Sequence, residues 1–201
     1  MPESPTRVEA FSDGVFAIAI TLLILEIQVP PHADHDLWAG LVALWPSYVA
    51  FLLSFLVILI MWVNHHELLN MARGVTYPFL FANGLLLLTV TIVPFPTAVL
   101  AEHLGTAQAA SAVAFYCATF FVNSLAWNAL FRTIVWQKLL RPDISAATLA
   151  GVHRAYLAAP LVYLTATLVA LVRPWIGLAI NASLWVLWVR LGYRAADVRN
   201  R

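Results

Sequence analysis

The chain has 201 residues, of which 62% are hydrophobic and only 10% are charged, and its mean hydropathy is +0.84. Soluble domains usually carry about 25% charged residues, and a soluble fold of this length could not hide so much apolar surface. The composition therefore excludes an ordinary soluble domain and indicates a membrane protein whose apolar surface faces lipid. The net charge of +1 points to no nucleic-acid partner, and none is expected.

Charged residues divide the sequence into apolar runs, from which we predict six membrane-spanning helices. A span needs about 20 residues, because a helix rises 1.5 Å per residue and the hydrocarbon core is ~30 Å thick. The predicted spans are residues 8–29, 38–63, 75–100, 106–131, 154–172 and 174–193. Together they predict one all-α polytopic membrane domain over residues 1–201.

The first run is ambiguous on length alone, because only 12 uncharged residues separate Asp13 from Glu26. If this run spans, Asp13 lies at membrane depth, where a carboxylate needs a partner or water.

Basic residues lie almost entirely on one side of the six predicted spans. Of the 11 basic residues, only Arg173 falls on the other side. The ten on the shared side are Arg7, Arg73, Arg132, Lys138, Arg141, Arg154, Arg190, Arg194, Arg199 and Arg201. Because cytoplasmic loops carry the excess of Lys and Arg, we expect a protein of the cell membrane with both termini in the cytoplasm.

Polar and helix-breaking residues inside the runs predict local features. Kinks are expected at four prolines, Pro46, Pro94, Pro96 and Pro160. Four intramembrane amides, Asn83, Asn123, Asn128 and Asn181, are expected to make interhelical hydrogen bonds rather than to carry transport. The connector Arg132–Arg154 is expected to form an amphipathic interfacial segment.

The first helix has two different faces. Placed at about 100° per residue, Phe11, Ile18, Leu22 and Leu25 fall on one stripe, and Thr21 borders it. Ser12 and Asp13 point toward roughly the opposite side, which predicts that they face neighbouring helices. For an arbitrary apolar helix, ordinary packing would be sufficient reason for such a stripe.

Two short groups of residues resemble a known family. They are Arg7, Phe11, Ser12 and Asp13 at the start of the first span, and Trp62, His65 and His66 at the end of the second. With the six-span layout, they resemble the transmembrane-protein-175 family of potassium channels (the endosomal/lysosomal potassium channel family), in its prokaryotic single-repeat form.

The resemblance implies a homotetramer in which the first helices surround a central pore. It implies a hydrophobic constriction at Ile18, Leu22 and Leu25, which agrees with the stripe, and it links Thr21 to potassium preference. The sequence has no Thr-Val-Gly-Tyr-Gly selectivity loop.

The charged motif residues allow two interpretations. Arg7 and Asp13 could form a surface ion pair, or Asp13 could join a buried polar cluster with Ser12, Trp62 and one of the two histidines. A carboxylate near the core strongly prefers a partner, which favours the cluster. In both cases the role is structural, because it fixes the tilt and rotation of the pore helix.

These observations favour a passive, potassium-preferring cation channel with lipid and permeant potassium ions as its partners. A secondary transporter, proton-coupled through Asp13 or His65, is the first alternative, although inverted repeats are not evident. A non-conducting membrane scaffold is the second. Neither a catalytic site, a metal site nor a cofactor is expected, because adjacent histidines rarely share one ion and no catalytic motif is present.

Overall fold

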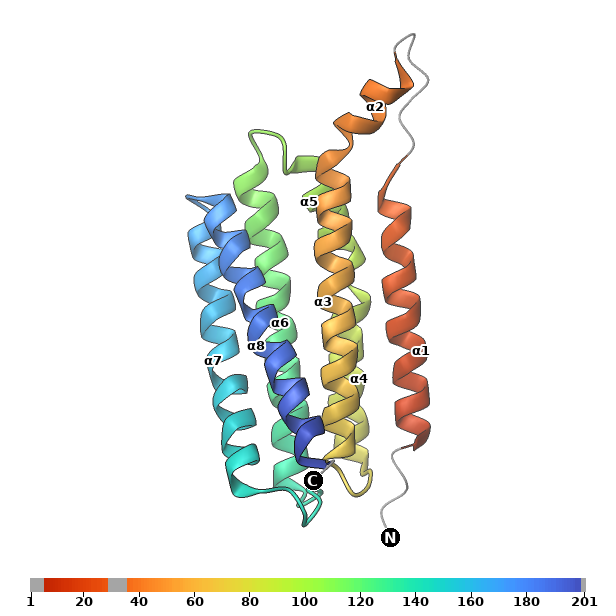
Figure 1. The fold of residues 1–201 in the computed structure, drawn as a ribbon, viewed down its shortest axis with the longest axis vertical. Coiled ribbons are helices and arrows are strands. Elements are labelled where there is room, and N and C mark those ends of the chain that lie inside the picture. The colour runs from red at the N-terminus through yellow and green to blue at the C-terminus, as the bar shows by residue number, and fades with distance from the viewer. Residues whose placement is uncertain (1–5, 29–35, 200–201) are drawn as a thin grey trace.

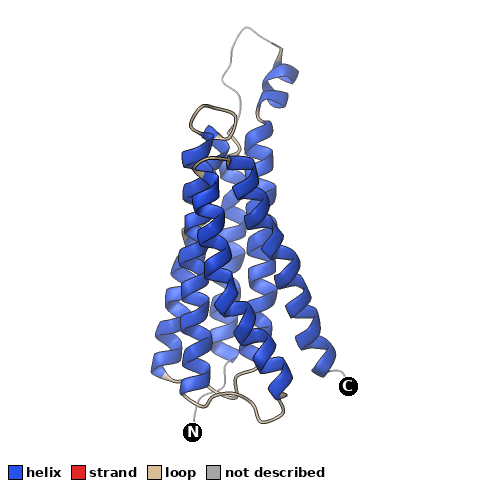
Figure 2. Cartoon of the chain, turned by 90° about the vertical axis from the view of Figure 1, so that its left-hand side faces the viewer, coloured by secondary structure: helices blue, strands red, loops and turns tan. Residues whose placement is uncertain are grey.

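The computed structural model describes residues 6–28 and 36–199, with side chains up to Val189, as a bundle of long antiparallel helices (Figure 1). The elements are α1 (Thr6–Leu22), the 3-10 turn η1 (Leu23–Glu26), α2 (Leu37–Ala43), α3 (Trp45–Asn70), α4 (Tyr77–Thr91), α5 (Pro94–His103), α6 (Ala109–Trp136), α7 (Ala146–Ala170) and α8 (Pro174–Arg199). The described chain contains no strand (Figure 2), which confirms the predicted all-α class.

Five helical segments of the described chain are long and apolar enough to cross a membrane. They are Thr6–Glu26, Trp45–Asn70, Tyr77–His103, Ala109–Trp136 and Ala146–Ala170. A shorter apolar helix, Pro174–Val189, follows them. The fold is therefore that of a multi-pass membrane protein.

Two predicted spans are interrupted where kinks were expected. The span predicted at 38–63 breaks at Leu44, and Pro46 lies in the first turn of α3. The span predicted at 75–100 breaks between α4 and α5, where Pro94 opens the new helix. Proline has no N–H to donate and fits the first turn of a helix, so each new helix begins with a proline in its first turn.

Other helix ends differ from the ends of the predicted spans, because charged residues need not end a helix. The structure extends α6 to Trp136 and starts α7 at Ala146, so the expected interfacial connector Arg132–Arg154 shrinks to residues 137–145. With 28 residues, α6 is about 42 Å long and exceeds the ~30 Å hydrocarbon core. The first α-helix ends early, at Leu22, and the predicted end at residue 29 lies outside the described residues.

The helix α1 begins, and α8 ends, at the same end of the bundle (Figure 1). We call this the basic end, because it carries Arg7, Arg73, Arg132, Lys138, Arg141 and Arg154. Two of its loops are joined by an isolated bridge between Ala72 and Leu140, and Arg73 Nη2 donates to the carbonyl oxygen of Lys138 at 2.9 Å. The α8 side chains beyond Val189 and all of Arg201 lie outside the described part.

All four intramembrane amides make interhelical hydrogen bonds, as predicted. In each case the Nδ2 atom is the donor. Asn83 donates to Ser12 Oγ, and Asn123 donates to Thr89 Oγ1. Asn128 donates to the carbonyl of Tyr156, and Asn181 donates to Cys117 Sγ. The buried Cys117 thiol is therefore an acceptor as well as a small apolar group.

The contact of Asn128 has a specific cause. Pro160 lies inside α7 and has no N–H for the carbonyl of Tyr156, four residues earlier. Asn128 Nδ2 reaches that carbonyl from α6, at 2.6 Å. An amide on one helix thus supplies the donor that proline removes from the other, and α7 continues through Pro160 without a break.

We expect Asn128→Leu to lower the free energy of unfolding by about 1–3 kcal/mol, because it leaves the Tyr156 carbonyl unpaired. Pro160→Ala restores an N–H to α7, so the double variant should regain part of that loss. Unfolding in mixed micelles measures both effects. Asn64→Leu is the control, since among the described residues Asn64 Nδ2 donates only to the carbonyl of Ile60 in its own helix. Strictly additive effects in the double variant would contradict this account.

Candidate functional site: the two faces of the first helix

The first helix lies at the edge of the bundle, where it packs against α3 and α4 (Figure 1). Its inward face buries Ser12, Phe16 and Ala19, and Leu23 of η1 continues that face. Val8, Val15 and Ile20 flank that face and are half-buried, and the opposite side of the helix is exposed on a single copy of the chain.

The outward face carries the apolar stripe expected from periodicity. Phe11 is 67% exposed, Ile18 61%, Leu22 42% and Leu25 67%. We call these four residues the outer stripe. Leu25 stays in line with Leu22 although the helix tightens at η1, because residues three apart eclipse in a 3-10 helix.

Thr21 borders the outer stripe and is exposed. Its hydroxyl donates to backbone carbonyls of its own helix, lying 3.0 Å from the oxygen of Ala17 and 2.9 Å from that of Ile18. The hydroxyl proton is therefore directed at the helix backbone, which leaves the hydroxyl oxygen able to accept.

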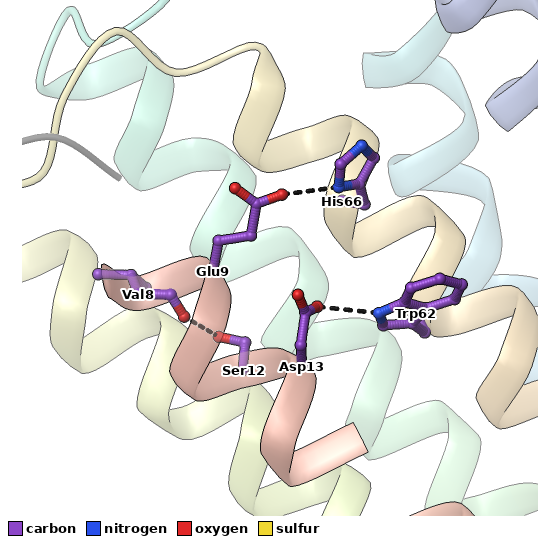
Figure 3. Close-up of polar contacts among 6 residues, drawn as sticks. All are labelled: Val8, Glu9, Ser12, Asp13, Trp62 and His66. Atoms are coloured by element: carbon purple, nitrogen blue, oxygen red, sulfur yellow. Dashed lines mark hydrogen bonds and ion pairs between the residues drawn. The ribbon is translucent and has the colours of Figure 1, made fainter. Parts of the chain in front are cut away.

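Two polar contacts join α1 to α3 in antiparallel order (Figure 3). Asp13 Oδ1 accepts a hydrogen bond from Trp62 Nε1 at 2.9 Å. One turn nearer the basic end, Glu9 Oε1 lies 2.7 Å from His66 Nδ1. The two acids are four residues apart on α1, and their partners are four residues apart, in the opposite chain direction, on α3. The two contacts therefore fix the register of the helix pair.

A third set of contacts forms one continuous series of hydrogen bonds through the buried side chains of Ser12, Asn83 and His65. Ser12 Oγ donates to the carbonyl of Val8 at 2.7 Å, so it must accept from Asn83 Nδ2, 3.0 Å away on α4. Asn83 Oδ1 is then free to accept from His65 Nε2, at 2.8 Å. Each group in this series of hydrogen bonds acts consistently as a donor or as an acceptor, which assigns the proton of His65 to Nε2.

His65 is also held by ring contacts. Its ring centroid lies 5.3 Å from that of Phe16 on α1 and 6.2 Å from that of Trp127 on α6. Its Nδ1 has no partner in the described chain. His65 therefore lies where α1, α3, α4 and α6 meet.

The sequence-based cluster differs in detail from the observed contacts. Asp13 contacts Trp62 as expected, but Ser12 bonds to Asn83 instead of joining Asp13. The two histidines divide between separate contacts, His65 with Asn83 and His66 with Glu9. No ion pair joins Arg7 to Asp13, and Arg7 is exposed at the basic end.

Sequence reasoning missed Glu9 and the role of Asn83 in this network. A signal for Glu9 was present, because two acids four residues apart on α1 meet two donors, Trp62 and His66, four residues apart on α3. For Asn83 no spacing on α1 or α3 could indicate the contact, since it comes from a third helix. The arrangement locks a helix in place, and no group of three metal-ligating side chains occurs among the described residues.

Comparisons with known proteins agree with this architecture. Residues 7–94 match the family model described as "Endosomal/lysosomal potassium channel TMEM175". A protein from Chamaesiphon minutus named as a potassium channel is 43% identical over 183 residues, which are 87% of this chain and 88% of that protein. A bovine protein named as an endosomal/lysosomal proton channel, TMEM175, is 34% identical over 84% of this chain but only 37% of its own length.

A solved structure shows the same fold. The crystal structure of a lysosomal potassium-selective channel TMEM175 homologue from Chamaesiphon minutus matches with a TM-score of 0.81 and 39% sequence identity. The match covers 94% of this chain and 97% of the other. By sequence identity over most of both chains, and by fold, the protein belongs to the TMEM175 family of potassium channels.

Proposed function

We propose that the chain conducts potassium ions passively, as a homotetramer in which α1 of each subunit lines a central pore. The observation that carries this proposal is the outer stripe, which stays exposed while other faces of the same helix are held by the buried Ser12–Asn83 hydrogen bond and by the exposed Asp13–Trp62 hydrogen bond. The relative from Chamaesiphon minutus is named as a potassium channel, which supports potassium as the permeant ion.

In this arrangement Ile18, Leu22 and Leu25 from four subunits close around the axis as stacked apolar rings. A narrow apolar ring resists conduction by dewetting, so ions pass only when the ring is wide enough to stay wet. Such a ring should favour potassium modestly over sodium, because potassium sheds its hydration shell more easily. The hydroxyl oxygen of Thr21, which is free to accept, would assist by replacing part of that shell.

The motif residues on the inward face would serve as the scaffold of the pore. Ser12 and Asp13 contact neighbouring helices and not the outer stripe. Their loss should damage folding or assembly before it changes ion preference. The proposed activity is therefore conduction through a positioned helix, with no catalytic step.

Proton conduction is a second candidate, favoured by the name of the bovine relative. The outer stripe carries no titratable side chain between Ile18 and Leu25, so protons would cross it only along water in an open pore. Secondary transport and a scaffold role remain the alternatives of other classes. Currents of single molecules distinguish them, because a channel passes ions far faster than a transporter turns over.

Ile18→Asn should increase the current and weaken the preference for potassium. The amide wets the ring and offers an oxygen to any cation, whereas isoleucine is apolar and stiff at χ1. The measurement is the reversal potential of purified protein in planar bilayers under a potassium/sodium gradient. In this variant it should shift toward the value of a channel that does not distinguish potassium from sodium.

Ile20→Asn is the matched control, since Ile20 is half-buried and off the outer stripe. Ile20→Asn protein that assembles normally should show an unchanged reversal potential. An unshifted potential for Ile18→Asn, or a larger shift for Ile20→Asn, would show that another face of α1 lines the path.

We further propose that the basic end faces the cytoplasm of the cell membrane, so that both termini are cytoplasmic. The support is the ten-to-one distribution of basic residues. Reporter proteins fused to each terminus should be active only as cytoplasmic markers. An external signal from either terminus would reverse the orientation.

A further inference from the structure

A groove between α6 and α7 has not been given a role by the proposed pore. It has a volume of about 300 Å³ and is lined by Leu125, Asn128, Ala129, Arg132, Leu157 and Pro160. It opens to the surface of the bundle, since Leu125 is 46% and Leu157 43% exposed. That volume lies at the lower end of the range for small-molecule sites, about 300–1,000 Å³.

The groove exists because the side chains that line its middle are small, or are turned away from it by a hydrogen bond. Ala129 has only a methyl group, and the ring of Pro160 is compact and tied to its own backbone. The Asn128 amide is turned toward the Tyr156 carbonyl at 2.6 Å and so does not fill the space. The two helices therefore pack closely and still leave an open slot on their outer side.

The two ends of the groove differ in chemistry. Leu125 lies deeper along α6, and Arg132 lies two turns farther on, toward the basic end. On α7, which runs antiparallel to α6, Arg154 precedes Leu157 by three residues and so shares its face one turn nearer the basic end. The groove thus passes from an apolar section to a section lined by Arg132, with Arg154 on the adjacent turn of α7.

Neither guanidinium is neutralised by the protein within its described side chains. Arg132 and Arg154 are both exposed, and neither forms an ion pair there. Arg154 Nε donates only to the carbonyl of Ala150 in its own helix, at 3.3 Å. Two cations at the end of an apolar slot complement a ligand that is apolar along its length and anionic at one end.

We propose that this groove binds an anionic phospholipid of the leaflet at the basic end. One acyl chain would lie against Leu125, Ala129 and Leu157, and the lipid phosphate would accept hydrogen bonds from Arg132, with Arg154 beside it. Guanidinium groups suit phosphate because they donate two parallel hydrogen bonds. Basic pockets between membrane helices are known sites for anionic headgroups.

Native mass spectrometry of the purified protein tests this inference, with phosphatidylglycerol and phosphatidylcholine of identical acyl chains as probes. Both lipids carry a phosphate, but the choline ammonium of phosphatidylcholine opposes the two guanidinium groups, so we expect phosphatidylglycerol to bind more tightly. Arg132→Gln should weaken phosphatidylglycerol binding about tenfold and phosphatidylcholine binding less. Arg132→Gln/Arg154→Gln should remove the preference for the anionic lipid.

Arg141→Gln is the control of equal charge change. Arg141 lies at the same end but off the groove, and it is engaged by Asp143, with Nε and Nη2 each 3.2 Å from a carboxylate oxygen. Those hydrogen bonds lower the pKa of the Asp143 carboxyl. Arg141→Gln should leave both lipids bound as in the wild-type protein.

Ala129→Phe fills the groove and keeps both arginines, so it decides the question even if the arginine variants fail to fold. It should lose phosphatidylglycerol while eluting normally on size exclusion. Retention of the lipid by this variant, equal loss in Arg141→Gln, or no preference for phosphatidylglycerol would overturn the proposal. Displacement of the lipid by millimolar inorganic phosphate would show a free-anion site instead, which also overturns it.

Discussion

The rotation of the first helix follows from the need to satisfy polar groups where water is absent. Ser12, Asn83 and His65 are buried, and each uncompensated polar group at such depth costs about 1–3 kcal/mol. Their hydrogen bonds run in one direction from α3 through α4 to α1. Turning α1 by even one residue position would break that chain. The polar face is therefore the constraint, and the outward position of the apolar face is its consequence.

That consequence gives the outer stripe its meaning. Exposed leucine and isoleucine are ordinary on a helix that faces lipid, so exposure alone does not identify a pore. What distinguishes α1 is that polar contacts of three residues outside the outer stripe fix its position. Glu9 and Asp13 contact α3, and Ser12 contacts α4. A helix that lines a pore must keep its rotation while ions pass, and in the proposed arrangement these contacts would provide that rigidity without placing a charge on the outer stripe.

Sequence reasoning reached the two faces of α1 because they depend only on helical periodicity and on the cost of a lone carboxylate in lipid. It could not reach helix ends such as Trp136, because a helix that leaves the bilayer needs no sequence signal at the membrane surface. It also missed Asn83 as the bridge to His65, because that contact depends on how a third helix packs. The remaining family assignments, the tetramer and its constriction, rest on resemblance and on the exposed stripe together.

The most direct test is block of the potassium current by a thiol reagent such as Ag⁺ in variants that each carry one introduced cysteine along α1. The native Cys117 is buried, so the wild-type current should be unaffected. The account predicts rapid block at Ile18→Cys, Leu22→Cys and Leu25→Cys, and none at Ala19→Cys or Leu23→Cys, whose positions face the bundle. Block at Ala19 and Leu23 with no effect at Ile18 and Leu22 would contradict it, because the ions would then follow a different face of the helix.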